Sequence, residues 1–557
     1  METQDFCKLM AKEIEKDDLK TKKQIADLRD SLIKKHRPNT IPSLVEIMTY
    51  LPRGSYNFVI KPTRTMSGVS PVALMTKPIP CPHGRCTYCP GGPNSQFGNV
   101  PQSYTGGEPA TMRAIRNNYD PYLQVFNRLE HYVLLGHSVD KIELIVMGGT
   151  FTAFDKEYQE EFIKYSFKAM NDFSKLFFEE DGTLDYPKFK KFFELPAKDF
   201  QSEERTKKIH KKLLEMKGEC ELKTEQEKNE SVKVRCVALC IETKPDWGLL
   251  EHGNQILKLG CTRVELGIQS VYEEVIKKVN RGHTIKDTID SIRILKDLGF
   301  KISAHYMPGL PLTDKKKDLE GMKQLFSDED YRPDMLKIYP TMVSKGTPLY
   351  LDYKKGNFKP LTADSAAEII AEFKESVPEY CRIQRIQRDV PTKQWEAGVE
   401  LTNFRQYLFQ KHKPKCKCIR CREPRKREIN WDKVEIKINE YGASNGTEYF
   451  ISAEDTENDL IIGCIRMRFP SESLREEITT SSAIIRELHV YGVATNIGAE
   501  GSVQHKGFGK KLLKKAEEIA KQNKKNKMII ISGIGVKKYY YNLGYEKEGP
   551  YVTKSLE

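Results

Sequence analysis

Short apolar runs alternate with longer amphipathic stretches through the middle of the 557-residue chain. The runs occupy residues 72–76, 142–147, 234–241, 264–268, 301–307 and 336–339. Between them, apolar residues recur at helical spacing. Strands separated by helices are typical of right-handed βα units around a parallel sheet. The pattern therefore predicts an α/β fold in which an incomplete TIM-like barrel occupies residues 71–390.

A helical, basic region precedes the predicted barrel, over residues 1–70. Residues 6–35 carry apolar positions at roughly helical spacing, and Pro42 begins a second short helix that runs to Met48. Residues 61–68 mix cations with hydroxyl groups, which suits either a phosphate-contacting loop or a solvated linker.

A smaller α/β unit follows the barrel, over residues 431–557. Its predicted strands are 461–467, 483–491 and 528–532, and its predicted helices are 507–521 and a short one within 539–544. Within the barrel, residues 155–232 are dense in Lys and Glu around Phe189, Phe192 and Phe193. We interpret that stretch as an inserted helical or partly flexible excursion, and its sequence assigns it no function.

Composition narrows the class of protein. No run of about 18 apolar residues occurs and residues 1–23 are charged, so we expect a cytoplasmic protein with no membrane anchor. Thirteen cysteines, six of them in two tight clusters, favour metal ligation in a reducing compartment over disulfides. The net charge of +13 suits a polyanionic partner such as nucleic acid, and a plain solubilising surface would give the same balance.

The loop after the first predicted strand carries Cys81, Cys86 and Cys89 among Gly and Pro residues. Three cysteinates can hold three irons of a 4Fe-4S cluster and leave the fourth iron open for substrate. The spacing is Cys-x4-Cys-x2-Cys, one residue longer than the usual radical S-adenosylmethionine (SAM) pattern. The alternative is a zinc knuckle with His83 as the fourth ligand. The motif by itself favours the cluster only modestly.

Loops after the next three predicted strands carry candidate cofactor-binding residues. Gly148 and Gly149 follow the second strand, Glu242 follows the third and Gln269 the fourth. Active-site groups in such barrels gather at the carboxyl ends of the strands, so we expect these residues to face the cysteine loop. Taken singly, each could equally be a residue that ends a strand.

A second cysteine cluster lies in the linker between the two α/β units, residues 391–430. Cys416, Cys418 and Cys421 stand in a hydrophilic stretch with no apparent core to bury them, which favours zinc over unliganded thiols. His412 is the nearest candidate for the fourth ligand. We predict that the linker cations bind nucleic acid together with Arg382, Arg385 and Arg388 upstream.

A glycine-containing loop precedes the predicted helix 507–521. Gln504-His505-Lys506-Gly507-Phe508-Gly509 matches Gln/Arg-x-x-Gly-x-Gly/Ala, a pattern that lets backbone N–H groups approach a pyrophosphate. The pattern is weak alone. Between a strand at 486–490 and the pair Tyr539 and Tyr540, it resembles the acyl-coenzyme A site of the GNAT family of N-acetyltransferases.

Five stretches connect these modules to one family. They are Cys-Pro-Gly-Gly-Pro at 89–93, Gln-Ser-Tyr-Thr-Gly at 102–106, Met-Gly-Gly-Thr-Phe at 147–151, Asn-Arg-Gly-His-Thr at 280–284 and Arg-Glu-Leu-His-Val-Tyr-Gly at 486–492. With the modules in this order, the chain resembles the catalytic subunit family of Elongator, the tRNA uridine C5-carboxymethyl transferases, over nearly its whole length.

The resemblance implies a radical SAM domain with a 4Fe-4S cluster and a GNAT-like domain that binds acetyl-CoA. Cys81, Cys86 and Cys89 would hold the cluster, the backbone of Gly148 and Gly149 would meet the amino group of SAM, and Glu242 and Gln269 would bind its ribose or amine. The implied acetyl-CoA contacts are Lys141, Glu487, Leu488, His489, Val490, Gln504, Gly507, Phe508, Gly509, Lys510 and Tyr540. Lys141 belongs to the radical domain, so the resemblance places the two domains against each other. Lys141 and Tyr540 are the catalytic candidates, and Tyr540 would protonate the leaving thiolate or pack on the cofactor.

The implied reaction uses both cofactors. Hydrogen removal from the methyl group of acetyl-CoA would give a carbon radical that adds to C5 of the wobble uracil in tRNA, and thioester hydrolysis would leave 5-carboxymethyluridine. The anticodon stem-loop of tRNA is thus the implied partner, contacted by the basic regions 1–70 and 391–430. The sequence does not identify the electron donor.

Two departures and two rival functions accompany the resemblance. The longer cysteine spacing bears on the shape of the loop more than on its ligands. The complete set of Cys416, Cys418 and Cys421 is typical of a simpler, archaeal-like member that acts without accessory subunits, with dimerisation left open. One rival is a protein lysine acetyltransferase with a structural iron–sulfur cluster, and the other is a tRNA-binding scaffold. The intact ligand sets disfavour the scaffold, and the radical module disfavours the simple acetyltransferase.

Overall fold

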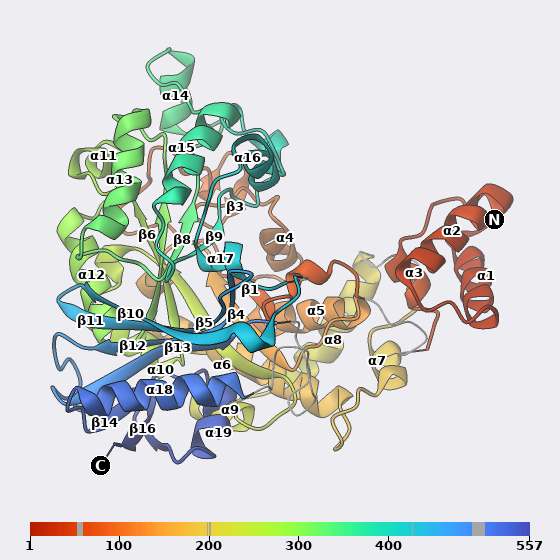
Figure 1. Cartoon of the computed structure of the whole chain (residues 1–557). Coiled ribbons are helices and arrows are strands. Elements are labelled where there is room, and N and C mark those ends of the chain that lie inside the picture. Colours follow the sequence, from red (N-terminus) through yellow and green to blue (C-terminus); the bar gives the residue numbers. More distant parts are fainter. Residues whose placement is uncertain (53–58, 198, 200–201, 426, 493–506, 557) are drawn as a thin grey trace.

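The computed structural model describes residues 1–52, 59–197, 199, 202–425, 427–492 and 507–556 (Figure 1). A barrel with a helical cover occupies the upper part of the view, a C-terminal sheet lies beneath it, and a small N-terminal helical body stands to one side. The predicted α/β class with two α/β units is confirmed. Within the described ranges, no helix has both the length and the apolar character needed to cross a membrane.

A parallel sheet of seven strands forms the incomplete barrel. In spatial order the strands are β1 (Ser70–Met75), β4 (Lys141–Met147), β5 (Arg235–Thr243), β6 (Arg263–Gln269), β7 (Lys301–Tyr306), β8 (Met335–Ile338) and β9 (Arg382–Arg385). The six apolar runs are confirmed as β1 and β4 to β8. β9 was not predicted as a strand, because Arg-Ile-Gln-Arg contains a single apolar residue.

Helices cover the outer face of this sheet (Figure 1). They are α4 (Pro109–Arg116), α5 (Pro121–Leu134), α6 (Lys156–Phe177), α10 (Leu250–Lys258), α12 (Ile285–Asp297), α13 (Lys315–Ser327) and α15 (Ala363–Glu375). Two further helices, α11 (Glu273–Lys278) and α14 (Pro348–Lys354), pack with the cysteine loop instead. Outward-facing strand residues such as Val72, Ile142 and Ile302 are 0% exposed beneath them. Polar caps fix several helix starts; for example, the side chain of Thr284 accepts a hydrogen bond from the backbone of Asp287.

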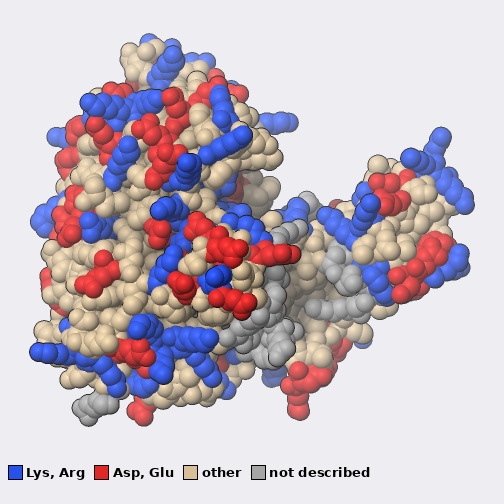
Figure 2. Space-filling view, viewed as in Figure 1, with Lys and Arg blue, Asp and Glu red and all other residues tan. Residues whose placement is uncertain are grey.

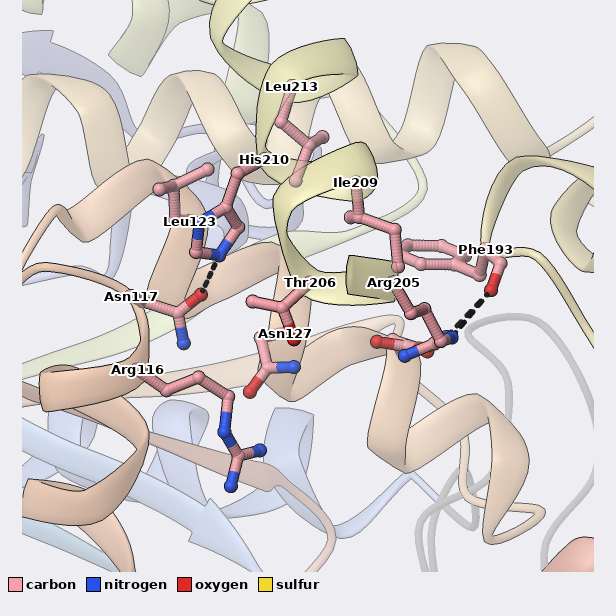
Figure 3. A pocket seen from close by; sticks show the side chains of 11 residues that line it. Arg116, Asn117, Leu123, Asn127, Phe193, Arg205, Thr206, Ile209, His210 and Leu213 are labelled. Carbon is pink, nitrogen blue, oxygen red and sulfur yellow. Dashed lines mark hydrogen bonds and ion pairs between the residues drawn. The ribbon is translucent and has the colours of Figure 1, made fainter. Parts of the chain in front are cut away.

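The excursion between β4 and β5 is helical, as predicted, and consists of α6, α7 (Tyr186–Phe192), α8 (Glu203–Lys217) and α9 (Leu222–Asn229). Phe189 and Phe193 are 0% exposed, so the described part is a packed layer rather than a flexible segment. Arg205 of α8 pairs with Glu130 of α5 beside a cavity of about 20 Å³ (Figure 3). The abundant Lys and Glu residues of this excursion therefore lie on the solvent face of a helical cover.

The N-terminal body consists of α1 (Thr3–Lys16), α2 (Lys22–His36) and α3 (Leu44–Met48) around its own small core. The predicted helical stretch 6–35 is two helices rather than one, because Thr21 caps α2 and exchanges hydrogen bonds with Gln24. The helix predicted from Pro42 to Met48 is confirmed as α3.

A second sheet of seven strands forms the C-terminal unit. In spatial order the strands are β10 (Val434–Ala443), β11 (Gly446–Asp455), β12 (Leu460–Phe469), β13 (Ser482–Val490), β14 (Lys527–Ile530), β16 (Tyr551–Ser555) and β15 (Glu546–Glu548). The predicted strands are confirmed as β12, β13 and β14, and the predicted helices as α18 (Phe508–Gln522) and α19 (Lys537–Tyr541). β10 and β15 were not predicted because most of their side chains are exposed and lack an apolar run.

The C-terminal sheet packs against the amino ends of the barrel strands. Arg486 donates to Phe300 O at 2.7 Å, one residue before β7 begins, and Arg466 donates to Tyr380 O at 2.6 Å, two residues before β9. The cysteine loop follows β1 and so lies at the opposite, carboxyl end of the barrel.

Candidate active site

The cysteine loop, residues 81–89, is held by the segment that follows α11. The backbone N–H of Thr87 donates to Val279 O at 3.0 Å, and Asn280 Nδ2 donates to Arg85 O at 2.9 Å. Cys86 and Cys89 are each 5% exposed. The thiols are therefore enclosed by the loops at the carboxyl ends of the strands, as predicted.

Hydrogen-bond donors and a buried cation surround these thiols. Arg281 places Nη1 3.7 Å from Cys86 Sγ, and the backbone N–H of Ser103 donates to Cys89 Sγ at 3.3 Å. Burial and the neighbouring Cys89 raise the pKa of Cys81 to about 11. Thiolates at Cys81, Cys86 and Cys89 would need compensating positive charge, which a metal centre together with Arg281 would supply.

The sulfur spacing separates the cluster from the zinc alternative. A single zinc ion with Zn–S bonds of about 2.3 Å needs its sulfurs roughly 3.8 Å apart. Among the described residues, the groups whose three ligand atoms lie within 4.8 Å of one another are Cys416, Cys418 and Cys421 and, separately, Glu242, Glu265 and His305. The loop cysteines do not form such a group. Their arrangement fits a centre of several irons better than a single ion.

His83 does not complete a zinc site either. Its Nε2 lies 3.2 Å from Cys86 Sγ and its Nδ1 lies 3.0 Å from Lys244 Nζ, so both ring nitrogens are engaged. Burial lowers the pKa of His83 to about 4, which keeps the ring neutral beside the ammonium.

Gly148, Gly149 and Gln269 form a cradle next to the cysteine loop that fits the polar groups of SAM. Gly148 and Gly149 adopt φ values of +126° and +106°, and a Cβ on Gly148 would lie 2.1 Å from Thr76 Oγ1. Gln269 ends β6 with φ +66°, and its buried Oε1 has no hydrogen-bond partner. A strained non-glycine residue with an unpaired buried acceptor is typical of a ligand site.

Glu242 lies in the same mouth, but its carboxylate points into the barrel interior. Tyr104 Oη donates to Glu242 Oε2 at 3.0 Å, and Lys337 Nζ lies 3.5 Å from Oε1. Its predicted contact with SAM stays a prediction, since the structure gives this carboxylate two protein partners.

The C-terminal sheet opens between β13 and β14. These strands pair in parallel only between residues 482–485 and 527–530. Beyond Ile485, β13 still pairs with β12. Among the described residues, its pairing with β14 ends at Ile485. The edge of β13 at residues 487–490, which includes Leu488, His489 and Val490, is half-buried and faces this opening. The backbone of Glu487, Leu488 and His489 lies along the predicted position of the pantetheine arm.

The N-terminus of α18 lies at the start of the predicted pyrophosphate site. Gly507 caps the helix with φ +79°, a conformation that favours glycine, and the first turn contains no acidic residue. Phe508 stacks on Trp431 with ring centroids 6.0 Å apart, while Lys510 is exposed. Gly509 follows with Tyr539 Oη 3.1 Å from the position of a Cβ. The arrangement fits a pyrophosphate; Gln504 lies outside the described residues.

The side chain of Glu487 lies in the domain interface, and the predicted contact of this residue with acetyl-CoA stays a prediction. Its carboxylate pairs with Lys301 of β7 and accepts a hydrogen bond from Arg466 at 2.7 Å. Burial would raise the pKa of Glu487, but Lys301 and Arg466 hold it well below its usual range. The side chain therefore belongs to the domain interface and leaves only the backbone for a cofactor.

Tyr540 is 5% exposed on α19, where Tyr539 and Tyr545 pack against it edge-on with ring centroids 5.2 and 5.9 Å away. Burial raises the pKa of Tyr540. Its hydroxyl is therefore protonated at neutral pH, as a proton donor to a leaving thiolate must be.

Lys141 begins β4 in register with Arg235, the first residue of β5. Burial lowers the pKa of Lys141. Arg235 meets the C-terminal unit directly, because a Cβ on Gly535 would lie 2.5 Å from Arg235 Cβ. Gly535 belongs to the turn Ile534–Val536, which leads into α19. Lys141 thus lies one strand away from the interface that carries Tyr540.

The second cysteine cluster is partly buried, contrary to the expectation from its hydrophilic surroundings: Cys418 is buried, and Cys416 and Cys421 are half-buried. Cys418 is 0% exposed because the turn packs on α15, whose Lys374 places Nζ 3.1 Å from Cys416 Sγ and 3.7 Å from Cys421 Sγ. The structure does not bring His412 into this group, and the buried Nε2 of His412 has no partner. Three thiols at single-ion spacing fit three of the four ligands of a zinc ion, and Lys374 Nζ would offset thiolate charge without coordinating the metal.

Fewer of the linker cations are available to a partner than the sequence indicated. Arg382 pairs with Glu423, and Arg422 pairs with Glu454 in the interior. Arg385 pairs with Asp389 at the surface. Figure 2 shows Lys and Arg interspersed with Asp and Glu over the face in view rather than gathered in one basic patch.

Sequence reasoning missed four residues around the cysteine loop: Arg281, Lys244, Tyr104 and Lys337. Arg281 and Tyr104 lie in two of the family stretches, Asn-Arg-Gly-His-Thr at 280–284 and Gln-Ser-Tyr-Thr-Gly at 102–106. Lys337 had a signal of its own, since a lysine within the fully buried strand Met-Leu-Lys-Ile needs an acidic partner.

The fold and the site define a two-domain protein in which a radical SAM barrel is joined to a GNAT unit. Residues 78–322 match the model of the Radical SAM superfamily, residues 333–413 that of the Radical_SAM C-terminal domain, and residues 410–545 that of the Acetyltransferase (GNAT) family.

Full-length relatives narrow this class to one family. The tRNA uridine(34) acetyltransferase of Methanocaldococcus jannaschii is 43% identical over 96% of this chain and 94% of its own length. Elongator complex protein 3 of Bos taurus is 38% identical over 93% of this chain and 90% of its own. The solved structure of Methanocaldococcus infernus Elp3 without its N-terminus superposes with a TM-score of 0.70 at 38% identity, covering 88% of this chain and all of that one. The chain belongs to the family of tRNA uridine(34) acetyltransferases and Elongator complex protein 3.

Proposed function

We propose that this protein forms 5-carboxymethyluridine at the wobble uridine of tRNA anticodons from acetyl-CoA and SAM. The observation that carries the proposal is the presence in one chain of a mouth of three thiols and a GNAT opening, at two ends of the same barrel. An acetyltransferase that acts on amines needs only the second of these. Relatives named tRNA uridine(34) acetyltransferase support the choice of substrate.

The chain's own residues have distinct tasks at the radical site. A bound 4Fe-4S cluster with SAM supplies the one-electron chemistry that removes hydrogen from an unactivated methyl group. Cys81, Cys86 and Cys89 would hold the cluster, and Arg281 would offset thiolate charge. The backbone of Gly148 and Gly149 and the unpaired Oε1 of Gln269 would orient the amino and ribose groups of SAM.

At the acyl site, the N-terminus of α18 would bind the pyrophosphate and the edge of β13 the pantetheine arm. Lys141 would contact the acyl cofactor from the barrel side. Tyr540, whose buried hydroxyl is protonated at neutral pH, would donate its proton to the departing thiolate.

Anaerobic reconstitution with iron and sulfide, followed by incubation with tRNA, acetyl-CoA, SAM and a reductant, tests this function. Nucleoside mass spectrometry should detect 5-carboxymethyluridine only when all components are present. Acetylation of protein amines without SAM would instead identify the lysine acetyltransferase. Binding of tRNA with no product would identify the scaffold.

We further propose that the Cys416, Cys418 and Cys421 group holds zinc and that the chain acts in the cytoplasm without accessory subunits. We also propose a division into a tRNA-contacting region 1–70, a radical domain 71–390, a zinc linker 391–430 and an acyl domain 431–557. The matched models, over 78–322, 333–413 and 410–545, support only the radical and acyl domains of this division. Metal analysis of Cys418→Ser against wild type tests the zinc. The mass of the active species in solution tests single-subunit action.

A further inference from the structure

Charged side chains occupy the barrel interior beneath the cysteine loop, where such barrels are usually filled by apolar layers. Glu242 of β5, Glu265 of β6, His305 of β7 and Lys337 of β8 meet there. Lys337 Nζ contacts Glu265 and lies 3.5 Å from Glu242 Oε1, and His305 Nε2 lies 3.1 Å from Glu265 Oε2. Because β6 and β7 separate β5 from β8, the contact between Glu242 and Lys337 crosses the interior.

This group has ligand atoms at metal-site spacing but already contains its cation. Glu242, Glu265 and His305 place one ligand atom each within 4.8 Å of the others. The ammonium of Lys337 contacts both carboxylates, and a metal ion among them would be repelled by it. We call Glu242, Glu265, His305 and Lys337 the floor, because this polar group lies at the base of the barrel mouth.

The floor is within reach of a ligand that enters from the mouth. The side chains of Glu242, His305 and Lys337 are 14%, 13% and 9% exposed, whereas Glu265 behind them is 1% exposed. Tyr104, which donates to Glu242, belongs to the segment whose Ser103 N–H donates to Cys89 Sγ. The same short segment thus links the floor to the cysteine loop.

The floor presents an acceptor beside a donor. Glu242 has lone pairs beyond those used by Tyr104 and Lys337, and the ammonium of Lys337 has three N–H groups for two carboxylate partners. Charged partners of this kind form hydrogen bonds stronger than neutral ones. An acceptor next to a donor is complementary to a planar imide, in which an N–H lies beside a carbonyl.

We propose that Glu242 and Lys337 read the base that is modified: Glu242 accepts the N3–H of the uracil and Lys337 donates to the neighbouring O4. This inference rests on the proposed function and specifies the base recognition of that same site. In the same pose, cytosine would turn a lone pair toward Glu242 and an amino group toward Lys337. A site built to hydrogen-bond a donor rejects an analogue that lacks it.

Anticodon stem-loops that carry uridine, cytidine or 3-methyluridine at the wobble position provide the test. Wild type should bind the uridine form about ten- to a hundredfold more tightly than either of the others. Glu242→Ala should reduce this preference to near one. Tyr104→Phe removes one hydrogen bond to the carboxylate without emptying the interior, and it should reduce the preference partly. Glu130→Gln, which alters a buried carboxylate paired with Arg205 in the outer helical layer, is the matched control and should keep it.

The outcomes separate this inference from the function itself. A preference lost in Glu242→Ala, weakened in Tyr104→Phe and kept in Glu130→Gln would support base reading by this floor. Equal binding of all three stem-loops by wild type would overturn it, as would a preference unchanged in both Glu242→Ala and Tyr104→Phe. Failure of wild type to form 5-carboxymethyluridine in the reconstituted reaction would count against the proposed function, whatever the binding preference.

Discussion

Buried polar groups at the two ends of the barrel differ in their hydrogen bonding, as Gln269 and Arg486 show. At the carboxyl end, Gln269 Oε1 and both ring nitrogens of His283 are buried without hydrogen-bond partners. At the amino end, Arg486 is equally buried, yet its guanidinium bonds to both oxygens of Asp334, to Glu448 and to a backbone carbonyl, all within 3.2 Å. Gln269 thus keeps an acceptor free where a cofactor is expected, whereas Arg486 is fully paired where the two domains meet.

Unpaired groups at the carboxyl end can bind a ligand, whereas the paired groups at the amino end hold the two domains in one arrangement. A buried ion pair is weak evidence for stability, but breaking it leaves an uncompensated charge, so it holds a single arrangement. The network of Arg486, Asp334, Arg466 and Glu487 therefore fixes the acyl opening relative to the barrel. The amino face of such barrels ordinarily serves stability. Here it also positions a second site.

The largest expected effect of a substitution is at the carboxyl end of the barrel. Cys86→Ala should abolish cluster binding and SAM cleavage, because the open-iron site needs all three thiolates. Acetyl-CoA binding by the C-terminal unit should persist. Iron content, absorption spectra and calorimetry with acetyl-CoA measure these effects. Cys261→Ala, which removes another buried thiol, is the control; a Cys86→Ala protein with a full iron complement would refute the ligand assignment.

At the amino end, Arg486→Met should destabilise the protein by about 3–5 kcal/mol, because Asp334 and Glu448 lose their buried partner. Denaturant unfolding measures the loss. Glu472→Gln breaks an exposed pair with Arg293 across the same interface and should cost no more than about 1 kcal/mol. Equal effects of the two changes would mean that burial does not distinguish these contacts.

Acid should weaken the same interface. Burial would raise the pKa of Asp334, but Arg486 and Arg466 hold it well below its usual range. A carboxyl group whose pKa is depressed by folding contributes stability above its unfolded pKa of about 3.9, and this contribution is lost as the pH falls below that value. Wild type should therefore lose stability below about pH 4 more steeply than Arg486→Met. Parallel pH profiles of unfolding for the two proteins would contradict this.

Much of the fold could be predicted because each buried parallel strand is a short apolar run. The six runs became strands within a few residues of their predicted ends. β9 and β10 were missed because an edge strand can be stabilised by its neighbour and by ion pairs without an apolar sequence, as Arg382 of β9 is by Glu423. The pattern of apolar and polar residues along a strand gives no information about partners that are distant in the sequence.

The candidate site could be predicted in part. Residues that act through backbone or thiol chemistry, such as Cys81, Gly148 and Gly507, were visible from spacing and residue type. Residues defined by a distant partner were not. The ion pair of Glu487 with Lys301 and the contact of Lys374 with Cys416 were not visible in the sequence, and His412 was named as a zinc ligand from proximity in sequence alone. Contacts across hundreds of residues depend on the fold.

A smaller effect should come from Lys141, which joins the barrel to the acyl site. Lys141→Ala should reduce tRNA-stimulated release of coenzyme A about ten- to a hundredfold, the loss expected for one charged hydrogen bond of roughly 1.5 to 3 kcal/mol. Iron content should not change. Release of coenzyme A is measured with and without tRNA, with Lys156→Ala as an exposed-lysine control on the same domain. Equal stimulated release in wild type and Lys141→Ala would remove this residue from the acyl site.

The smallest expected effect concerns tRNA at the edge of the carboxyl mouth. Arg388 donates to Ser103 O and lies with its guanidinium 5.8 Å from the centre of the Tyr104 ring, while Arg385 is exposed beside Asp389. If both contact phosphates, the double variant Arg385→Ala/Arg388→Ala should bind tRNA more weakly and lower the slope of log affinity against log salt by up to about two, since each neutralised phosphate contributes nearly one counterion. Lys207→Ala, an exposed cation paired with Glu203 on α8, should leave the slope unchanged. Filter binding over a salt series measures all three proteins. A slope that is equal in wild type and in the double variant would mean that these arginines serve the structure of the mouth, so that the phosphate contacts lie elsewhere on the chain.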